Sequence, residues 1–296
     1  MELKRPPMPL AAVRALRPRQ WIKNGVVLVP LLFAKAAARG DMVWKALGAL
    51  VAFSLLASTV YLMNDWVDRE RDRHHPEKKN RPIAAGHLGG ASVVMLIVIC
   101  LSGFTGIGWW VGKGFLYASA AYLALQVLYT FWLKHMVILD VLAIASGFIL
   151  RVMVGAEAIQ VEMSNWLLLC TLLGAVFLGL AKRRHELSSL EGSAAAHRAN
   201  LGDYSLGMLD QMMSISAATT ILAYGLYTVS KETVEHVGSD RLKFTVPCVI
   251  YGIFRYLFLV HKRGAGGSPE KVLLSDPALL IDAGAFLAVA AWALYV

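Results

Sequence analysis

Long apolar stretches separated by short polar loops run through the chain. Nine stretches of about 17–25 mainly apolar residues are long enough to cross a membrane as helices. They occupy residues 22–38, 43–63, 91–110, 114–133, 137–156, 164–181, 211–230, 244–261 and 277–296. No segment alternates as barrel strands do, and only helices and closed barrels satisfy the backbone in lipid. We therefore expect an all-α polytopic membrane protein with nine transmembrane helices in one domain, residues 1–296.

The positions of lysine and arginine predict how these spans are oriented. Twenty of the 29 basic residues fall on the side that holds the N-terminus, seven fall on the other side, and Arg151 and Arg255 lie within spans. Cytoplasmic loops are enriched in lysine and arginine. The N-terminus is therefore expected in the cytoplasm, in a multi-pass protein of the cell (inner) membrane.

Composition supports a membrane protein and narrows its partners. The chain is 57% hydrophobic and 17% charged, whereas soluble domains carry about 25% charged residues. The net charge of +9 suits anionic membrane lipids or phosphorylated substrates. Nucleic acid is not an expected partner, because the basic residues lie in short membrane loops. The sequence leaves the oligomeric state open, a homo-oligomer included.

An acidic motif follows the second apolar stretch. On a helix, Asn64, Asp68 and Asp72 share one face at i, i+4 and i+8, and Asp65 joins the two aspartates at i, i+3 and i+7. Carboxylates gathered in this way repel one another unless a cation lies between them. Hard oxygen ligands of this kind suit Mg²⁺ together with substrate phosphates. A solvated charged loop would explain the charge but not the helical spacing.

Basic residues in the same set of loops are candidates for binding phosphate. Arg81 is preferred in the first loop, because arginine grips phosphate in a bidentate way. Its neighbours Lys78 and Lys79 are better explained as membrane anchors. Further candidates, each with membrane anchoring as the alternative, are Lys134, Lys182, Arg183 and Arg184. The acidic and basic loops together favour a site that faces the cytoplasm.

Polar residues inside apolar stretches need a reason to be there. Arg151 and Glu157 lie within the fifth stretch, where charge is costly and usually faces a bundle interior or a cavity. They could pair with each other, or Arg151 could point into a substrate cavity. Lys23 and Asn24 lie at the start of the first stretch, where polar side chains likewise need an explanation.

Taken together, these residues resemble the UbiA superfamily of intramembrane prenyltransferases. The family's acidic motif is matched by Asn64-Asp65-x-x-Asp68-x-x-x-Asp72, and its following segment by Asn80-Arg81-Pro82. The resemblance covers nearly the whole chain. It implies a nine-helix bundle that uses Mg²⁺ at a cytoplasmic site, with Asp65, Asp68 and Asp72 as catalytic metal ligands helped by Asn64.

Two departures point to one branch of that superfamily. The second aspartate-rich motif of the aromatic prenyltransferases is absent, and the basic cluster 182–184 stands in its region. Their Y-x-x-x-K motif is one residue longer here, from Tyr129 to Lys134. Segments 17–24, 133–135 with 139–141, 182–187, 251–256 and 269–276 resemble the branch that transfers phosphoribosyl groups.

That branch implies a particular reaction. Phosphoribosyl pyrophosphate would donate its 5-phosphoribosyl group to decaprenyl (polyprenyl) phosphate, as a step toward cell-wall arabinan. The residues expected to bind substrate are Lys23, Asn64, Arg81, Tyr129, Lys134, Arg151, Lys182, Arg183 and Arg184. The alternatives are an aromatic prenyltransferase that uses a prenyl diphosphate, and a transporter, for which the expected inverted repeats are not evident.

Overall fold

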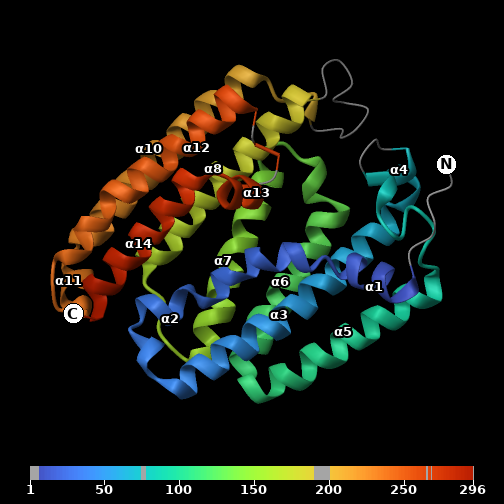
Figure 1. Ribbon diagram of the computed structural model, residues 1–296, viewed down its shortest axis with the longest axis horizontal. Coiled ribbons are helices and arrows are strands. Elements are labelled where there is room, and N and C mark those ends of the chain that lie inside the picture. The colour runs from blue at the N-terminus through green and yellow to red at the C-terminus, as the bar shows by residue number, and fades with distance from the viewer. Residues whose placement is uncertain (1–6, 75–77, 190–200, 265, 268, 296) are drawn as a thin grey trace. The chain divides into compact units, whose positions relative to one another are not determined.

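All regular structure in the described residues is helical. The computed structural model describes residues 7–74, 78–189, 201–264, 266–267 and 269–295 (Figure 1). Eight helical segments in these ranges are long and apolar enough to cross a membrane: α3 (Gly40–Val67), α5 (Gly90–Val111), α6 (Lys113–Phe131), α7 (Leu139–Ile159), α8 (Asn165–Ser189), α10 (Leu206–Val229), η6 (Arg241–Thr245) continued by α12 (Val246–Arg263), and α14 (Pro277–Tyr295). The expected all-α, multi-span architecture is confirmed, and these eight coincide with the second to ninth predicted stretches.

The first predicted stretch, 22–38, is not a continuous helix. It lies in the 3₁₀ helix η1 (Pro18–Leu28), the short helix α2 (Val29–Phe33) and the 3₁₀ turn η2 (Ala36–Ala38). Pro30 has no N–H to donate to the preceding turn, and Lys35 adopts a left-handed φ of 54°. Apolar composition predicted a span here, but these two residues interrupt it.

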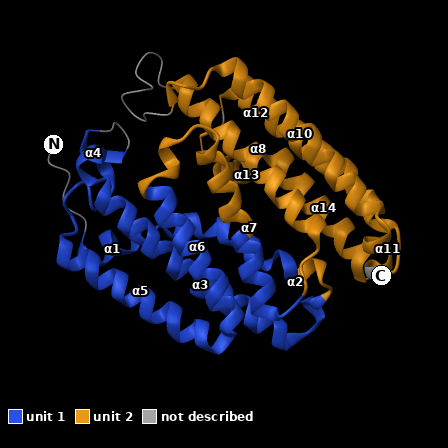
Figure 2. Cartoon of the chain, turned by 180° about the vertical axis from the view of Figure 1, so that it is seen from behind, with its two compact units in different colours: residues 1–31, 36–130, 150–161 blue, residues 32–35, 131–149, 162–296 orange. Residues whose placement is uncertain are grey.

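The chain forms two compact units (Figure 2). Unit 1 comprises residues 1–31, 36–130 and 150–161, and unit 2 comprises residues 32–35, 131–149 and 162–296. Helix α7 therefore contributes residues to both. The remaining described elements are short: α1 (Met8–Leu16), α4 (Arg69–Arg73), η3 (Lys78–Asn80), η4 (Leu133–His135), α11 (Lys231–Val237) and α13 (Pro269–Ser275).

Each unit has its own apolar core. In unit 1, Phe53, Leu56 and Phe115 are almost fully buried in one large cluster. A second cluster of unit 1, here called the N-terminal cluster, consists of the buried residues Ala11, Ala15, Leu62, Ile83, Leu88 and Val93. In unit 2, the largest core gathers Phe177, Met213 and Tyr256 from three spans.

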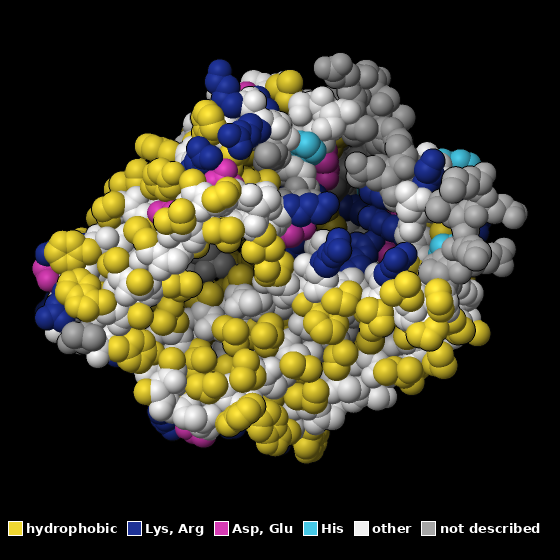
Figure 3. Space-filling view, viewed as in Figure 1, with side chains coloured by type: hydrophobic (Ala, Val, Ile, Leu, Met, Phe, Trp, Pro, Cys, Tyr) yellow, Lys and Arg dark blue, Asp and Glu magenta, His cyan; other side chains and the backbone are white. Residues whose placement is uncertain are grey.

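Many large apolar side chains lie on the outside. Trp109, Tyr117 and Ile281 are each more than 70% exposed. Figure 3 shows hydrophobic side chains over much of the viewed face. Water-soluble proteins rarely expose so much apolar surface, so these side chains are expected to face lipid.

Candidate active site

The acidic motif lies where α3 gives way to α4. Helix α3 ends at Val67, and Asp68 caps it with φ −88° and ψ 4°. The helical spacing nevertheless continues, because the Asp68 N–H donates to the Asn64 carbonyl at 2.9 Å and the Asp72 N–H donates to the Asp68 carbonyl at 2.8 Å. Asp65 and Asp72 are both buried, and their carboxylates meet a common partner.

That partner is Arg81, from the loop that follows α4. Its Nη1 donates to Asp65 Oδ1 at 3.0 Å and to Asp72 Oδ2 at 2.6 Å. One cationic nitrogen thus joins the first and last aspartates of the motif. The structure brings together Asp65, Asp72 and Arg81, three of the residues singled out from the sequence.

A second arginine at this site, Arg17, was not among the predicted site residues. Its Nη2 lies 2.5 and 2.8 Å from the two carboxylate oxygens of Asp65. Arg17 follows α1 with a left-handed φ of 54°, which turns the chain from α1 into η1. No local pattern signals this contact, because 48 residues separate Arg17 from Asp65.

The N-terminal cluster holds these elements in place. Ala11 and Ala15 come from α1, Leu62 from α3, and Ile83 and Leu88 from the loop that carries Arg81. The same loop is tightened where the Gly86 N–H donates to the Ile83 carbonyl at 3.1 Å. Gly86 has a φ of +71°, a conformation that glycine adopts without steric cost. The loop that carries Arg81 therefore makes a tight turn at Gly86.

Asn64 has its own partner within unit 1. The hydroxyl of Thr130, near the end of α6, donates to Asn64 Oδ1 at 2.7 Å. Thr130 is buried. The contact fixes the orientation of the Asn64 amide beside the acidic motif.

Arg151 is buried in a polar network in unit 1. Its Nη2 donates to the Tyr122 hydroxyl at 3.0 Å and its Nε to Asn24 Oδ1 at 3.2 Å. The Asn24 amide in turn donates to the Ser54 hydroxyl at 3.0 Å. Glu157 is exposed, and its carboxylate lies against Gly114. The network explains how charge is tolerated at Arg151.

Arg183 is fully buried in unit 2. Its Nε lies 3.1 Å from Asp140 Oδ2, and its Nη1 is paired with Glu186. The Tyr204 hydroxyl donates to Asp140 Oδ1 at 2.9 Å. Burial, with the Asp140 charge adding to it, raises the pKa of Tyr204 to about 12, so this hydroxyl stays protonated and donates at physiological pH. Asp140 and Tyr204 were not predicted to act together.

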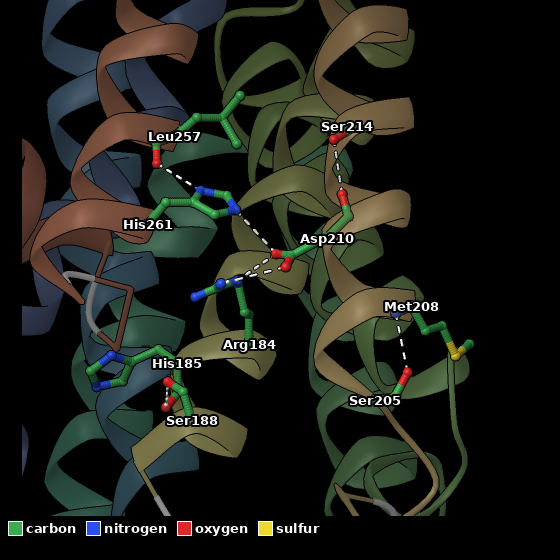
Figure 4. A network of polar contacts seen from close by, with 9 residues as sticks. All are labelled: Arg184, His185, Ser188, Ser205, Met208, Asp210, Ser214, Leu257 and His261. Atoms are coloured by element: carbon green, nitrogen blue, oxygen red, sulfur yellow. Dashed lines mark hydrogen bonds and ion pairs between the residues drawn. The ribbon is translucent and has the colours of Figure 1, made fainter.

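Arg184 belongs to a second network of unit 2 (Figure 4). Its Nε donates to Asp210 Oδ1 at 2.5 Å, and His261 Nε2 lies 3.1 Å from the same oxygen. These residues join α8, α10 and α12. His261 Nδ1 also lies 2.9 Å from the Leu257 carbonyl, one turn earlier in α12.

The other predicted basic and aromatic residues are distributed over both units. Lys23 lies in η1 and Tyr129 in α6, and both belong to unit 1. Lys134 lies in η4 and Lys182 in α8, and both belong to unit 2. All four are partly buried.

The acidic motif has the chemistry to hold a divalent cation together with a ligand. Among the described residues, no three His, Cys, Asp or Glu side chains form a complete metal-binding group. Asp65 and Asp72 do converge on one positively charged nitrogen. Mg²⁺ typically binds through one or two carboxylates plus substrate phosphates, and two convergent carboxylates fit that requirement.

The fold and this motif define a multi-pass membrane protein with a buried acidic site at the end of a span. The chain belongs to the UbiA prenyltransferase family, whose sequence profile matches residues 27–263. The resemblance to that family is confirmed, and with it the expectation of a membrane-embedded transferase.

Comparison with individual proteins gives the same result. Proteins named decaprenyl-phosphate phosphoribosyltransferase are similar over most of their length: that of Mycobacterium tuberculosis is 36% identical and covers 96% of this chain and 94% of the relative. That of Mycolicibacterium smegmatis is 34% identical and covers 91% and 87%. A solved UbiA homolog from Archaeoglobus fulgidus bound to GPP and Mg²⁺ has a TM-score of 0.73 at 16% identity, and covers 97% of this chain and 100% of that chain.

Proposed function

We propose that this chain transfers the 5-phosphoribosyl group of phosphoribosyl pyrophosphate to decaprenyl phosphate, or to another polyprenyl phosphate. Diphosphate would be released, and the product would be decaprenylphosphoryl-5-phosphoribose for cell-wall arabinan synthesis. The observation that carries this substrate assignment is the 34–36% identity, over most of the chain, to proteins named for that activity.

In this proposal Asp65, Asp68 and Asp72 hold Mg²⁺, with help from Asn64. The convergence of Asp65 and Asp72 on one guanidinium nitrogen supports the choice of ligands, as does the Mg²⁺ bound in solved members of the fold. When bound, Mg²⁺ neutralises charge that develops on the leaving diphosphate.

The bond changes follow from the chemistry of the two substrates. An oxygen of the lipid phosphate attacks C1 of the ribose, and the bond from C1 to the diphosphate breaks. The lipid phosphate is already anionic, so the reaction needs no strong general base. Holding both substrates in line supplies much of the rate.

The basic residues divide between binding and positioning. Lys134, Lys182 and Arg184 are proposed to bind phosphate groups, with Lys23 and Tyr129 as further candidates. Arg183 and Arg151 are buried and already hold side chains of their own unit. We therefore give these two a positioning role instead of direct contact with substrate.

The orientation in the membrane is part of the proposal. The N-terminus is placed in the cytoplasm of the cell, with the active site on the same side of the inner membrane. Segment 18–38 then serves as a ninth, interrupted crossing before α3. Lys4, Arg5 and Arg198 contribute to the charge bias that supports this orientation and lie outside the described residues. Residues 1–296 are taken as a single catalytic domain, because the family profile matches residues of both units.

A transfer assay tests the proposal. Purified protein is incubated with Mg²⁺, ¹⁴C-labelled phosphoribosyl pyrophosphate and decaprenyl phosphate, and the label in the lipid phase is counted. We expect lipid-bound label that disappears when the metal is chelated. A parallel reaction offers decaprenyl diphosphate with 4-hydroxybenzoate. Prenylated aromatic product without sugar transfer would replace the proposed activity by aromatic prenyl transfer.

The first variant to assay is Asp68→Asn. We expect it to insert and fold normally but to lose about 100-fold or more in turnover, because a metal site supplies several kcal/mol of charge stabilisation. Glu70→Gln is the matched control, since Glu70 is an exposed neighbouring acid paired with Arg73. Turnover of Asp68→Asn equal to that of the control would remove Asp68 from the metal ligands.

A further inference from the structure

Two arginines neutralise the acidic motif, and one precedes the motif in the sequence whereas the other follows it. Arg17 reaches Asp65 from the α1–η1 turn, and Arg81 reaches Asp65 and Asp72 from the loop before α5. The carboxylates are 5% exposed, whereas the side chains of Arg17 and Arg81 are 25% and 29% exposed. The acids are therefore buried, and the arginines have room to move.

Arg81 takes the place between the carboxylates that the proposed function gives to a divalent cation. Buried carboxylates are costly unless a positive charge accompanies them, and Arg81 Nη1 meets that need for both acids at once. A divalent cation and a guanidinium at such short range repel each other strongly. Binding the cation through Asp65 and Asp72 therefore requires Arg81 to leave.

If the cation binds together with a diphosphate, the displaced Arg81 guanidinium can bind the phosphate oxygens of that diphosphate. Arginine presents a planar set of donors that matches phosphate oxygens, and it keeps its charge at any physiological pH. Arg17 has the same chemistry and shares Asp65. Ala15 and Ile83 of the N-terminal cluster lie two residues from Arg17 and Arg81 and anchor the backbone there. The exchange of partners is therefore limited to the arginine side chains.

We propose that Arg17 and Arg81 are exchangeable counter-ions. They neutralise Asp65 and Asp72 when the site is empty, and they move to phosphate oxygens when a divalent cation binds together with a diphosphate. This inference rests on the proposed function, because it uses the same metal ligands. It adds that the site binds a cation–diphosphate complex as a unit and binds a bare cation weakly, since only the complex offers the arginines a new partner.

Binding measurements on the full-length protein in detergent test this exchange. Mn²⁺ binding is followed by electron paramagnetic resonance, and binding of ³²P-labelled inorganic pyrophosphate is followed at saturating Mn²⁺. We expect Arg81→Gln to bind Mn²⁺ alone more tightly and the Mn²⁺–pyrophosphate complex more weakly. The ratio of the two affinities should change by about 5–150-fold, the usual range for coupled sites. Arg17→Gln should shift both affinities in the same directions.

Arg69→Gln is the matched control. Arg69 lies between Asp68 and Asp72 in the sequence, but its side chain stacks over Trp66 and donates to the Trp66 carbonyl. We expect both of its affinities to equal those of the unmodified protein. If Arg81 only supports the local structure, Arg81→Gln lowers both affinities together, and that result overturns the exchange.

A second measurement needs no variant. Phenylglyoxal modifies accessible arginines, and mass spectrometry reports the modified fraction of Arg81. We expect Mn²⁺ alone to increase modification of Arg81, and Mn²⁺ with pyrophosphate to decrease it. Unchanged modification under both conditions, in protein that binds the complex, overturns the exchange but leaves the proposed function standing. Failure of the unmodified protein to bind Mn²⁺ in either form overturns the proposed metal site itself.

Discussion

Arg151 and Arg183 are buried, and each has a side-chain partner far away in the sequence. Arg151 donates to Asn24 across 127 positions, and the fully buried Arg183 meets Asp140. A buried charge left without a partner costs several kcal/mol. These contacts therefore fix which segments come together inside each unit, in addition to any role in catalysis.

The pair formed by Arg255 and Asp276 predicts a pH dependence. The guanidinium donates to both carboxylate oxygens, at 3.2 and 2.8 Å, and holds the pKa of Asp276 below its usual value. A carboxyl whose pKa is lower in the folded state stabilises the fold above its unfolded pKa and ceases to do so as pH falls through the folded pKa. We expect Asp276→Asn to lower the Tm at pH 7, and the difference to shrink below about pH 4.

Asp276→Asn removes the carboxylate charge but keeps a side chain that can cap α14. Asp276 Oδ1 accepts from the Leu279 N–H at the start of α14, and asparagine caps helices about as well as aspartate. Asp41→Asn is the control, because Asp41 forms an exposed pair with Arg39, a kind of pair that contributes little. A Tm difference for Asp276→Asn that stays constant from pH 7 into the acid range would contradict the assigned cause.

At this scale, local spacing decided what could be predicted. Asp65, Asp72 and Arg81 were identifiable because helical periodicity and a nearby basic loop mark them. Arg17 and Tyr204 were not assigned roles, because their contacts with Asp65 and Asp140 span 48 and 64 positions. One sequence carries no direct sign of such a long-range contact.

At the scale of elements, α7 and η1 approach each other closely at Gly155. A Cβ added at Gly155 would lie 2.0 Å from the Val27 carbonyl oxygen. Gly155 follows Arg151 by one turn, so the same contact brings the Asn24 segment within reach. We expect Gly155→Ala to destabilise the fold by about 1–3 kcal/mol, as overpacking does, and to lower the Tm measured in detergent.

Gly174→Ala in α8 is the matched control. A Cβ there has nothing within 4 Å, so alanine should stabilise the helix by about 0.5–1 kcal/mol. Equal Tm values for the two variants would show that the contact at Val27 relaxes at no cost.

The long helices were predictable because an apolar stretch of sufficient length has few other stable structures in lipid. The predicted stretch 22–38 has the same apolar character but contains Pro30, and Lys35 takes a left-handed conformation. Hydrophobicity alone does not distinguish a continuous helix from 3₁₀ turns, so this element was predicted as a span and found interrupted.

For the whole molecule, the proposed orientation predicts a labelling pattern. In a background lacking Cys100, Cys170 and Cys248, single cysteines are placed at Val13, Lys79 and Lys231, all exposed positions. In right-side-out vesicles, a membrane-impermeant maleimide should label Lys231→Cys alone. All three should react after the vesicles are opened.

The position at Val13 decides whether segment 18–38 crosses the membrane. Labelling of Val13→Cys in sealed vesicles, with Lys79→Cys protected, would leave eight crossings and place both termini on the outer side. Protection of both would support nine crossings with the N-terminus inside.

The bond between Asn24 and Arg151 also has a consequence for biosynthesis. The ribosome makes residues 18–38 first, yet the buried Asn24 side chain receives its guanidinium donor only after α7 has been synthesised. A nascent chain that ends before α7 leaves Asn24 with Ser54 alone. Segment 18–38 therefore reaches its final packing late. The insertion machinery has to accommodate this segment without its contact to α7 until about half of the protein has been made.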